Sequence, residues 1–377
     1  MPDLVAIDLP AGPAWVAAAQ AAWDRGDAVA PLDQRLGGRG RAAVLDALAP
    51  AVVVGPGGPR RRAGGVPTEE GDALVVATSG TSGAAKGVVL THDAVAASAR
   101  ATTARLGVDP GRHRWLACLP LSHVGGLSVV TRALLTGTAL TVLPRFEAGA
   151  VLANAGPEVM VSLVPTALTR VGAAPFHTVV LGGSAPPAPL PGNVVTTYGL
   201  TETGSGVVYD GVPLAGVEVG VDPGTAEIRL RGPMLLRAYR DGSVPLDAGG
   251  WLPTGDAGRL GAGGCLVVDG RLSDLIVTGG ENVWPAAVEA VLGRHPSVAT
   301  VAVAGLPDPE WGERVVAWVV PRPGAPAPTL DGLRALVGDE LAPYAAPRQL
   351  VLVSSLPTTP SGKVRRSGLG RGAGPGR

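Results

Sequence analysis

Near-continuous apolar runs alternate with helical stretches through the middle of the chain, and this alternation limits the folds that the chain can adopt. The apolar runs and helical stretches together lie at residues 73–78, 87–91, 93–106 (an Ala-rich helix), 115–119, 127–136, 140–143, 148–155, 159–164, 167–171, 178–181 and 194–197. Strands that are apolar along their whole length are typical of parallel sheets, which helices cover on both faces. We therefore expect an α/β fold in which mostly parallel sheets are flanked by helices.

The patterns on either side of this alternation divide the rest of the chain. Residues 1–72 predict only a reduced N-terminal region, and residues 207–268 predict a small β-subdomain of short strands between Gly and Pro turns. We expect one large N-terminal domain over residues 1–270. Residues 271–367 predict a small α+β C-terminal domain, followed by a flexible Gly-rich tail at 368–377.

Charge and composition exclude several classes of protein. The 31 basic and 31 acidic residues balance, so no net field draws the chain to nucleic acid or to an anionic membrane. Two cysteines cannot form a disulfide framework, and the five histidines are too scattered for a zinc site. The chain begins without a basic signal-peptide region, and no apolar run approaches the ~18 residues of a membrane span. We expect a cytoplasmic protein with no nucleic-acid partner and no membrane insertion.

Lysine is rare in this chain. Of the 31 basic residues only Lys86 and Lys363 are lysines, and the excess of Ala, Gly, Arg and Pro indicates a GC-rich coding sequence. A lysine kept against that bias marks a place where a compact ammonium does what a guanidinium cannot.

The segment Thr78–Gly87 has the composition of a phosphate-binding loop. Its small residues let backbone N–H groups approach a phosphate, its hydroxyls add donors, and Lys86 adds a point charge. It is not a Walker A loop, because Ala85 and Gly87 stand where that motif has Gly and Ser or Thr. The predicted phosphate-binding residues are Thr78, Ser79, Gly80, Thr81, Ser82, Gly83 and Lys86.

This loop resembles the phosphate-binding signature of the adenylate-forming enzymes, which include acyl-CoA synthetases, peptide-synthetase adenylation domains and luciferases. Further segments resemble that family in the same order, at residues 119–126, 181–186, 197–203, 250–256, 270–282 and 360–365. The resemblance implies an AMP-forming acid–thiol ligase, which uses ATP and Mg²⁺ to convert a small-molecule carboxylic acid into an acyl-AMP and then transfers the acyl group to CoA. It also implies a mobile C-terminal domain that rotates between these two steps.

The resemblance assigns roles to individual residues around ATP. The nucleotide would be held by Gly182, Gly183, Ser184, Thr197, Tyr198 and Gly199, with Asp256 and Arg271 at the ribose. Thr201 would bond a phosphate oxygen, and Glu202 would bind Mg²⁺ through a carboxylate oxygen. Lys363 would enter the site during adenylation and bond both the acyl carboxylate and the α-phosphate, which offsets the repulsion between two anions.

Other positions are implied to serve the acid, CoA and the domain movement. The acyl pocket would contain His123, Gly125 and Ser205. The CoA channel would be bordered by Gly279, Gly280 and Glu281, and Ser273 occupies the hinge position.

The segments 163–168 and 270–285 and the short chain most resemble the 2-succinylbenzoate–CoA ligases of menaquinone synthesis. That acid has a second carboxylate, for which Arg170, Arg132 and Ser205 are candidate partners. A homodimer is one way to compensate for the reduced N-terminal region.

Three alternatives stay open. The chain could be a ligase for another aryl or medium-chain acid, an adenylation protein that loads a separate carrier, or an inactive nucleotide-binding protein. The last is disfavoured because the chain keeps Lys86, Glu202, Asp256, Arg271 and Lys363 together.

Overall fold

The computed structural model describes residues 1–79, 85–184, 186, 189–358 and 364–370. The chain divides into two compact units. The first contains residues 1–220, 229–254 and 261–266, and the second contains residues 221–228, 255–260 and 267–377. Within the described residues, the helices are all too short or too polar to cross a membrane.

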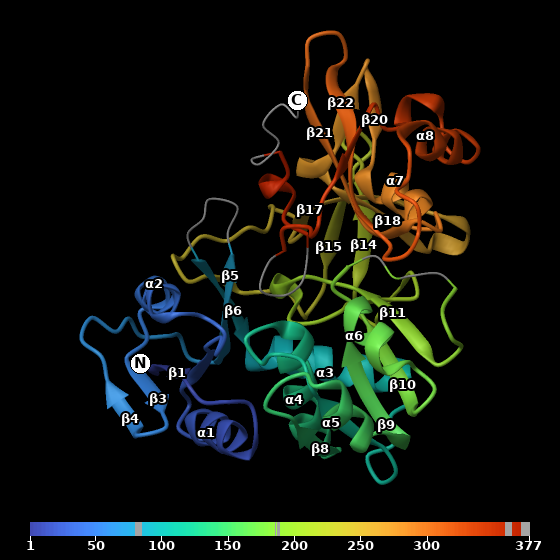
Figure 1. Ribbon diagram of the computed structural model, residues 1–377. Helices are drawn as coiled ribbons and strands as arrows, with labels where there is room; N and C mark the ends of the chain where they lie inside the picture. Colours follow the sequence, from blue (N-terminus) through green and yellow to red (C-terminus); the bar gives the residue numbers. More distant parts are fainter. Residues whose placement is uncertain (80–84, 185, 187–188, 359–363, 371–377) are drawn as a thin grey trace. The chain divides into compact units, whose positions relative to one another are not determined.

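One seven-stranded sheet of the first unit is built largely from the N-terminal region (Figure 1). Its strands, in spatial order, are β16 (Ala238–Tyr239), β6 (Ala85–Thr91), β5 (Asp72–Ser79), β2 (Ala28–Pro31), β1 (Leu4–Ile7), β3 (Val52–Gly55) and β4 (Gly58–Arg61). β1 is parallel to β2 and β3, and β2 is parallel to β5, whereas β4, β6 and β16 pair antiparallel. The helices of this region are α1 (Pro13–Trp23) and α2 (Gly38–Leu48). The sequence reasoning missed β1 and β2, which are four-residue apolar stretches bounded by Asp3 and Asp8 and by Asp27.

A second seven-stranded sheet carries the alternating pattern of the sequence. Its order is β13 (Val212–Pro213), β12 (Val208–Tyr209), β11 (Val194–Tyr198), β10 (Phe176–Leu181), β9 (Gly156–Leu163), β7 (Arg114–Ala117) and β8 (Ala139–Val142). The five strands from β11 to β8 are parallel. Helices α5 (Ala148–Ala153) and α6 (Pro165–Val171) connect successive strands. The predicted α/β class with mostly parallel sheets is therefore confirmed.

Two helices lie between these sheets. α3 (His92–Leu106) packs on β5 and β6, α4 (Val124–Thr136) packs on β7, β8 and β9, and the two helices pack on each other (Figure 1). Thr91 caps α3 by accepting from the Ala94 N–H at 3.1 Å. Gly126 lets α4 begin close to the preceding segment, because a Cβ there would overlap the carbonyl oxygen of Leu119.

The strands of residues 207–268 divide among three sheets. β12 and β13 extend the second sheet and β16 extends the first, whereas the remaining strands form a separate four-stranded sheet. That sheet has the order β14 (Glu218–Val221), β15 (Glu227–Arg231), β17 (Leu252–Leu260) and β18 (Leu266–Arg271).

The second unit contains a five-stranded sheet with its own core. The strand order is β20 (Glu281–Val283), β19 (Ile276–Thr278), β22 (Gly312–Pro321) and β21 (Val298–Asp308), and β23 (Gln349–Leu352) pairs with β22. Helices α7 (Pro285–Leu292) and α8 (Leu330–Gly338) contribute Val288, Leu292 and Leu333 to a buried cluster. Arg366 joins the described residues 364–370 to this core, because it donates to Asp274 at 3.1 Å and to Glu289 at 2.7 Å.

Candidate active site

The carboxyl ends of parallel strands form one edge of the second sheet. β7 leads into residues 119–126, β10 leads into residues 182–184, and β11 leads into residues 199–205. Ligands of open α/β sheets bind at this edge. Three of the segments with predicted binding residues therefore lie together at the carboxyl-terminal edge of the second sheet.

The segment predicted to line adenine follows β10. Gly182 donates its N–H to the Leu163 carbonyl at 3.1 Å, and a Cβ at this position would lie 2.6 Å from Thr197 Oγ1 on the adjacent strand. Gly183 has a φ of +90°, which a side chain would disfavour, and Ser184 is exposed. Tyr198 is half-buried at the end of β11. Glycine at position 182 thus lets the end of β10 pack closely against Thr197 of β11.

The turn after β11 is closely packed and internally bonded. A Cβ on Gly199 would overlap the Ser205 carbonyl oxygen, so only glycine fits there. The hydroxyl of Thr203 accepts from the Leu200 N–H at 2.9 Å and donates to the Ser205 carbonyl at 2.7 Å. The short helix η1 (Thr201–Thr203) between these bonds presents Thr201 and Glu202, both of which are half-buried.

Glu202 belongs to a polar cluster that sequence reasoning only partly predicted. Tyr239 on β16 donates its hydroxyl to Glu202 Oε1 at 3.0 Å, and Lys86 Nζ lies 5.0 Å from the centre of the Tyr239 ring. Burial, followed by the charge of Glu202, raises the pKa of Tyr239, so the phenol stays protonated and donates. Asp241 lies near Lys86, and hydrogen bonds from Ser243, with a smaller contribution from Lys86, lower the pKa of Asp241. Tyr239 itself was missed.

The predicted phosphate loop connects two paired strands. Thr78 on β5 lies opposite Lys86 on β6, and the Thr78 hydroxyl donates to the Lys86 carbonyl at 3.4 Å. The pair Ser79 and Ala85 follows in the same register. The predicted residues Gly80, Thr81, Ser82 and Gly83 lie outside the described part of the chain.

His123 precedes α4 and contacts the N-terminal region. Arg35 Nη2 lies 2.9 Å from His123 Nε2, and because a guanidinium only donates, Nε2 is the acceptor if the two form a hydrogen bond. Arg35 also pairs with Asp33 at 2.6 Å. Burial opposes ionisation of Asp33, but the hydrogen bonds and charge of Arg35 outweigh it and lower the pKa of that carboxyl. Gly125 is exposed in the first turn of α4.

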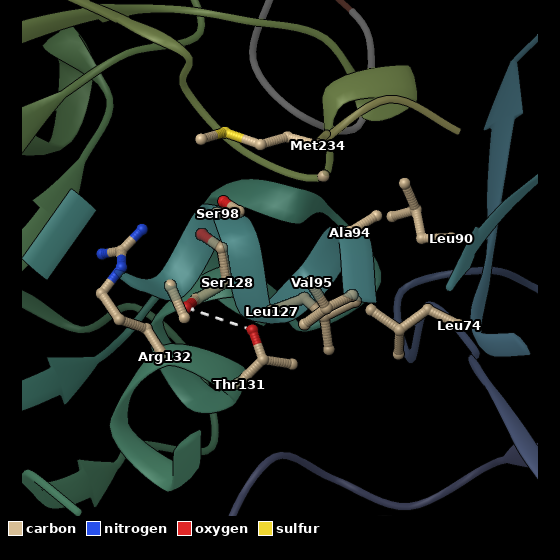
Figure 2. Close-up of a pocket in the computed structure, with 12 residues that line it drawn as sticks. Leu74, Leu90, Ala94, Val95, Ser98, Leu127, Ser128, Thr131, Arg132 and Met234 are labelled. Atoms are coloured by element: carbon tan, nitrogen blue, oxygen red, sulfur yellow. Dashed lines mark hydrogen bonds between the residues drawn. The ribbon is translucent and has the colours of Figure 1, made fainter. Parts of the chain in front are cut away.

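A small cavity lies between α3 and α4 and reaches Gly204 in the turn after η1 (Figure 2). Its volume of about 10 Å³ is room for roughly one water molecule. Polar groups enter it from both helices, and its lining residues are Leu74, Leu90, Ala94, Val95, Ser98, Ala99, Leu127, Ser128, Thr131, Arg132, Gly204 and Met234.

Arg132 is the cation of this cavity. Its side chain is 2% exposed, and its Nε and Nη1 are buried without a hydrogen-bond partner among the described residues. The guanidinium lies 4.7 Å from the centre of the Trp115 ring, and burial lowers the pKa of Arg132. Ser98, also in the lining, shares a 2.9 Å hydrogen bond with Ser205. Of the three candidates for a second carboxylate, Arg132 and Ser205 are therefore linked to the cavity, whereas Arg170 is exposed on α6.

The predicted ribose pair lies in the second unit. Arg271 Nε is 2.8 Å from Asp256 Oδ1, and the Asp256 side chain is only 10% exposed. Gly255, with a φ of +69°, donates its N–H to Glu227 at 2.8 Å and brings the backbone next to this pair. The carboxylate is thus held by an arginine at the end of β18.

The predicted CoA-channel glycines form the tight turn between β19 and β20. Gly279 and Gly280 have φ values of +60° and +84°, and Thr278 pairs with Glu281 across the turn. Positive φ at both central positions is what a two-residue hairpin turn of type I′ requires. Ser273 is exposed in the short helix η3 (Leu272–Asp274). Lys363 lies outside the described residues.

Comparison with known proteins identifies the family of this fold. Residues 60–239 match the family model described as AMP-binding enzyme, and residues 287–363 match the AMP-binding enzyme C-terminal domain. The chain is 41% identical to the "Probable 2-succinylbenzoate--CoA ligase" of Mycobacterium tuberculosis (strain ATCC 25618 / H37Rv), over 79% of this chain and 84% of that relative. The chain belongs to the AMP-binding enzyme family.

Solved structures of this family share the fold. The o-succinylbenzoate CoA synthetase (MenE) from Bacillus subtilis in complex with the acyl-adenylate intermediate OSB-AMP matches with a TM-score of 0.86 and 28% identity, over 98% of this chain and 88% of that one. The same synthetase in complex with ATP and a magnesium ion matches with a TM-score of 0.84 and 28% identity, over 97% of this chain and 89% of that one. The predicted family and the class of AMP-forming acid–thiol ligase are therefore confirmed.

Proposed function

We propose that this AMP-binding enzyme is a 2-succinylbenzoate–CoA ligase of menaquinone biosynthesis. In the first step a carboxylate oxygen of the acid attacks the α-phosphorus of ATP, and pyrophosphate leaves to give the acyl-AMP. In the second step the CoA thiol attacks the acyl carbon, and AMP leaves with the formation of the thioester. The observation that carries the substrate assignment is the buried, unpaired guanidinium of Arg132.

An unpaired buried cation is costly, and it calls for an anion. Removing an ion from water without a partner costs several kcal/mol, which a carboxylate in the same cavity would offset. A monocarboxylic acid uses its carboxylate for adenylation and has none left for Arg132, whereas 2-succinylbenzoate has a second one. The cavity is too small for the acid as it stands, and Met234 is the most adaptable residue of its lining.

The residues around the triphosphate support the adenylation step. Thr201 and Lys86 would donate to phosphate oxygens, and Glu202 fits a magnesium ion because its Oε2 has no hydrogen-bond partner among the described residues. No cluster of three possible metal ligands occurs among those residues, so phosphate oxygens and water would complete the shell. Magnesium, when bound, neutralises charge on the phosphates. Lys363 would stabilise the two anions that react.

The other parts of the proposal rest on the same assignment. CoA would be the acyl acceptor, reached along Gly279, Gly280 and Glu281, with rotation about Ser273 between the two steps. We also propose that the enzyme acts in the cytoplasm, and that a homodimer compensates for the reduced N-terminal region.

A panel of acids tests the function directly. With Mg²⁺, ATP and CoA, we expect AMP and pyrophosphate to form in equal amounts with 2-succinylbenzoate, and a CoA thioester to appear by mass spectrometry. Other aryl and medium-chain acids should react at least about tenfold more slowly. ADP and phosphate as products would contradict the ligase class, and a faster reaction with another acid would contradict the substrate.

The ribose contact gives a second prediction. Because the Asp256 carboxylate would accept from the ribose hydroxyls, Asp256→Asn should raise KM for ATP roughly 10- to 150-fold, since hydrogen bonds to a charged group contribute roughly 1.5–3 kcal/mol. Wild-type enzyme should prefer ATP to 2′,3′-dideoxy-ATP, and the variant should lose most of that preference. A preserved preference in Asp256→Asn would rule out the contact, and an unchanged KM for the acid is the control.

A further inference from the structure

Tyr239 joins two groups that are far apart in the sequence. Its hydroxyl donates to Glu202 Oε1 at 3.0 Å, 37 residues away, and its ring lies beneath the ammonium of Lys86, whose Nζ is 5.0 Å from the ring centre. One side chain therefore contacts both the carboxylate proposed for magnesium and the lysine proposed for the phosphates.

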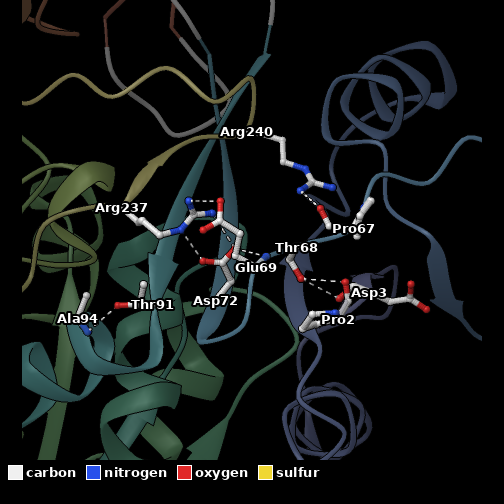
Figure 3. A network of polar contacts seen from close by, with 10 residues as sticks. All are labelled: Pro2, Asp3, Pro67, Thr68, Glu69, Asp72, Thr91, Ala94, Arg237 and Arg240. Carbon is white, nitrogen blue, oxygen red and sulfur yellow. Dashed lines mark hydrogen bonds and ion pairs between the residues drawn. The ribbon is translucent and has the colours of Figure 1, made fainter.

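The strand that carries Tyr239 is fixed independently of any ligand (Figure 3). Arg237 donates to both oxygens of the buried carboxylate of Asp72, from Nε at 2.9 Å and from Nη2 at 3.0 Å. Arg240 donates to the carbonyls of Leu48 at 3.0 Å and Pro67 at 2.8 Å. These two arginines lie on either side of Tyr239, and β16 pairs with β6 in the same stretch. The backbone position of Tyr239 is thus fixed by the hydrogen bonds of Arg237 before it and of Arg240 after it.

Packing around β6 adds to this constraint. A Cβ on Gly87, the residue after Lys86, would lie 2.8 Å from Cβ of Arg240 and 2.6 Å from Leu48. The backbone of β6 therefore lies directly against the segment that follows β16. The relative position of Lys86 and Tyr239 is set by backbone contacts as well as by the two side chains.

We propose that Tyr239 is a positioning residue for magnesium-bound ATP: its hydroxyl holds one oxygen of Glu202 so that the other is presented to the metal, and its ring holds Lys86 beside them. This role rests on the proposed adenylation function. A hydrogen bond to a metal-binding carboxylate fixes its orientation, and loss of such an outer partner typically lowers metal affinity 10- to 100-fold.

The ring has a separate effect on Lys86. Among the described residues no carboxylate forms an ion pair with its ammonium within 4.0 Å, and Asp241 acts on Lys86 only through its charge, so the ring attracts the cation without a direct ion pair. The positive charge of Lys86 thus stays available to phosphate oxygens while its position is restricted. The hydroxyl and the ring can be tested apart, because Phe keeps the ring and Leu removes both.

The test measures binding of ATP by titration calorimetry with excess Mg²⁺ and with EDTA, without any acid, so that no turnover occurs. Mg²⁺ is expected to raise the affinity of the wild-type enzyme for ATP. In Tyr239→Phe this gain should be about tenfold smaller, whereas the affinity for ATP in EDTA should stay within about twofold of the wild-type value. Tyr239→Leu should weaken binding in EDTA as well. Glu202→Gln should also lose the gain in ATP affinity from Mg²⁺. The double variant Glu202→Gln/Tyr239→Phe should have the same ATP affinity as Glu202→Gln alone, because both changes act on the same contact.

The controls separate this role from folding and from the proposed function. Tyr209→Phe removes the hydroxyl of another tyrosine, one that bonds Thr102 at 3.2 Å, and it should keep the wild-type gain from Mg²⁺. A wild-type gain in Tyr239→Phe, or an additive loss in the double variant, would overturn the role of Tyr239. The proposed function is judged independently, by AMP formation in the acid panel.

Discussion

Replacing Arg132 by glutamine is expected to lower kcat/KM for 2-succinylbenzoate about 100-fold or more. The guanidinium is 2% exposed and has two buried nitrogens without a partner, so a carboxylate bound there would form a desolvated ion pair. Removing one member of such a pair costs about 2–5 kcal/mol, which corresponds to roughly 30- to several-thousand-fold. Initial rates of AMP formation, measured over a range of acid concentrations, give this number.

The specificity of this effect is checked with an analogue and a second arginine. 4-Oxo-4-phenylbutanoate lacks the ring carboxylate, so wild type and Arg132→Gln should use it almost equally well. Arg170→Gln makes the same chemical change at an exposed position and should keep the preference for 2-succinylbenzoate. Equal losses for both acids in Arg132→Gln would mean that Arg132 supports packing and does not recognise the second carboxylate.

Replacing Arg237 by methionine is expected to lower the free energy of unfolding by about 3–5 kcal/mol. The Asp72 side chain is completely buried, and both its oxygens accept from Arg237. Without Arg237, the buried carboxylate would keep its hydrogen bond from the Glu69 N–H at 2.9 Å but would lose its paired charge, which is the costly way to break a buried ion pair. Urea unfolding, followed by tryptophan fluorescence, measures the loss.

The matched control for this variant is Arg231→Met. Arg231 also binds a carboxylate with two nitrogens, at 2.9 and 2.6 Å from Glu218, but the side chains of Arg231 and Glu218 are 41% and 57% exposed. Exposed pairs contribute little because water and salt screen them. The control should therefore lose much less stability than Arg237→Met, and similar losses would argue against a special cost of leaving Asp72 unpaired.

The fold class followed from sequence because long apolar strands and helices alternate in the middle of the chain. The α/β prediction rested on the segments that form β5 to β11 in the structure. Their apolar composition can be recognised without knowing which strands pair with each other. β1 and β2 were not found this way, since each is a four-residue apolar stretch next to aspartates, at Asp3 and Asp8 and at Asp27. The placement of β16 beside β6 was equally hidden, because a two-residue strand is defined only by its partner.

The site was predictable where it forms a contiguous motif and hidden where distant segments meet. Tyr198, Thr201 and Glu202 lie in one segment, so their types and spacing carried the prediction. Tyr239 and Arg35 act on groups 37 and 88 residues away, and no local pattern marks such pairs. From the sequence, Arg132 was one of three candidate partners for the second carboxylate of the acid. Its burial between α3 and α4 depends on tertiary packing, which the sequence does not show.

The place of β16 also limits how this protein can be shortened. A fragment that ends at residue 206, after the last parallel strand, contains nearly all of both large sheets yet lacks β12 and β16. β11 and β6 would then each expose an unpaired strand edge, and such edges template aggregation. A fragment meant to preserve the first sheet should therefore extend at least through residue 240, so that it keeps β16 and the hydrogen bonds of Arg237 and Arg240.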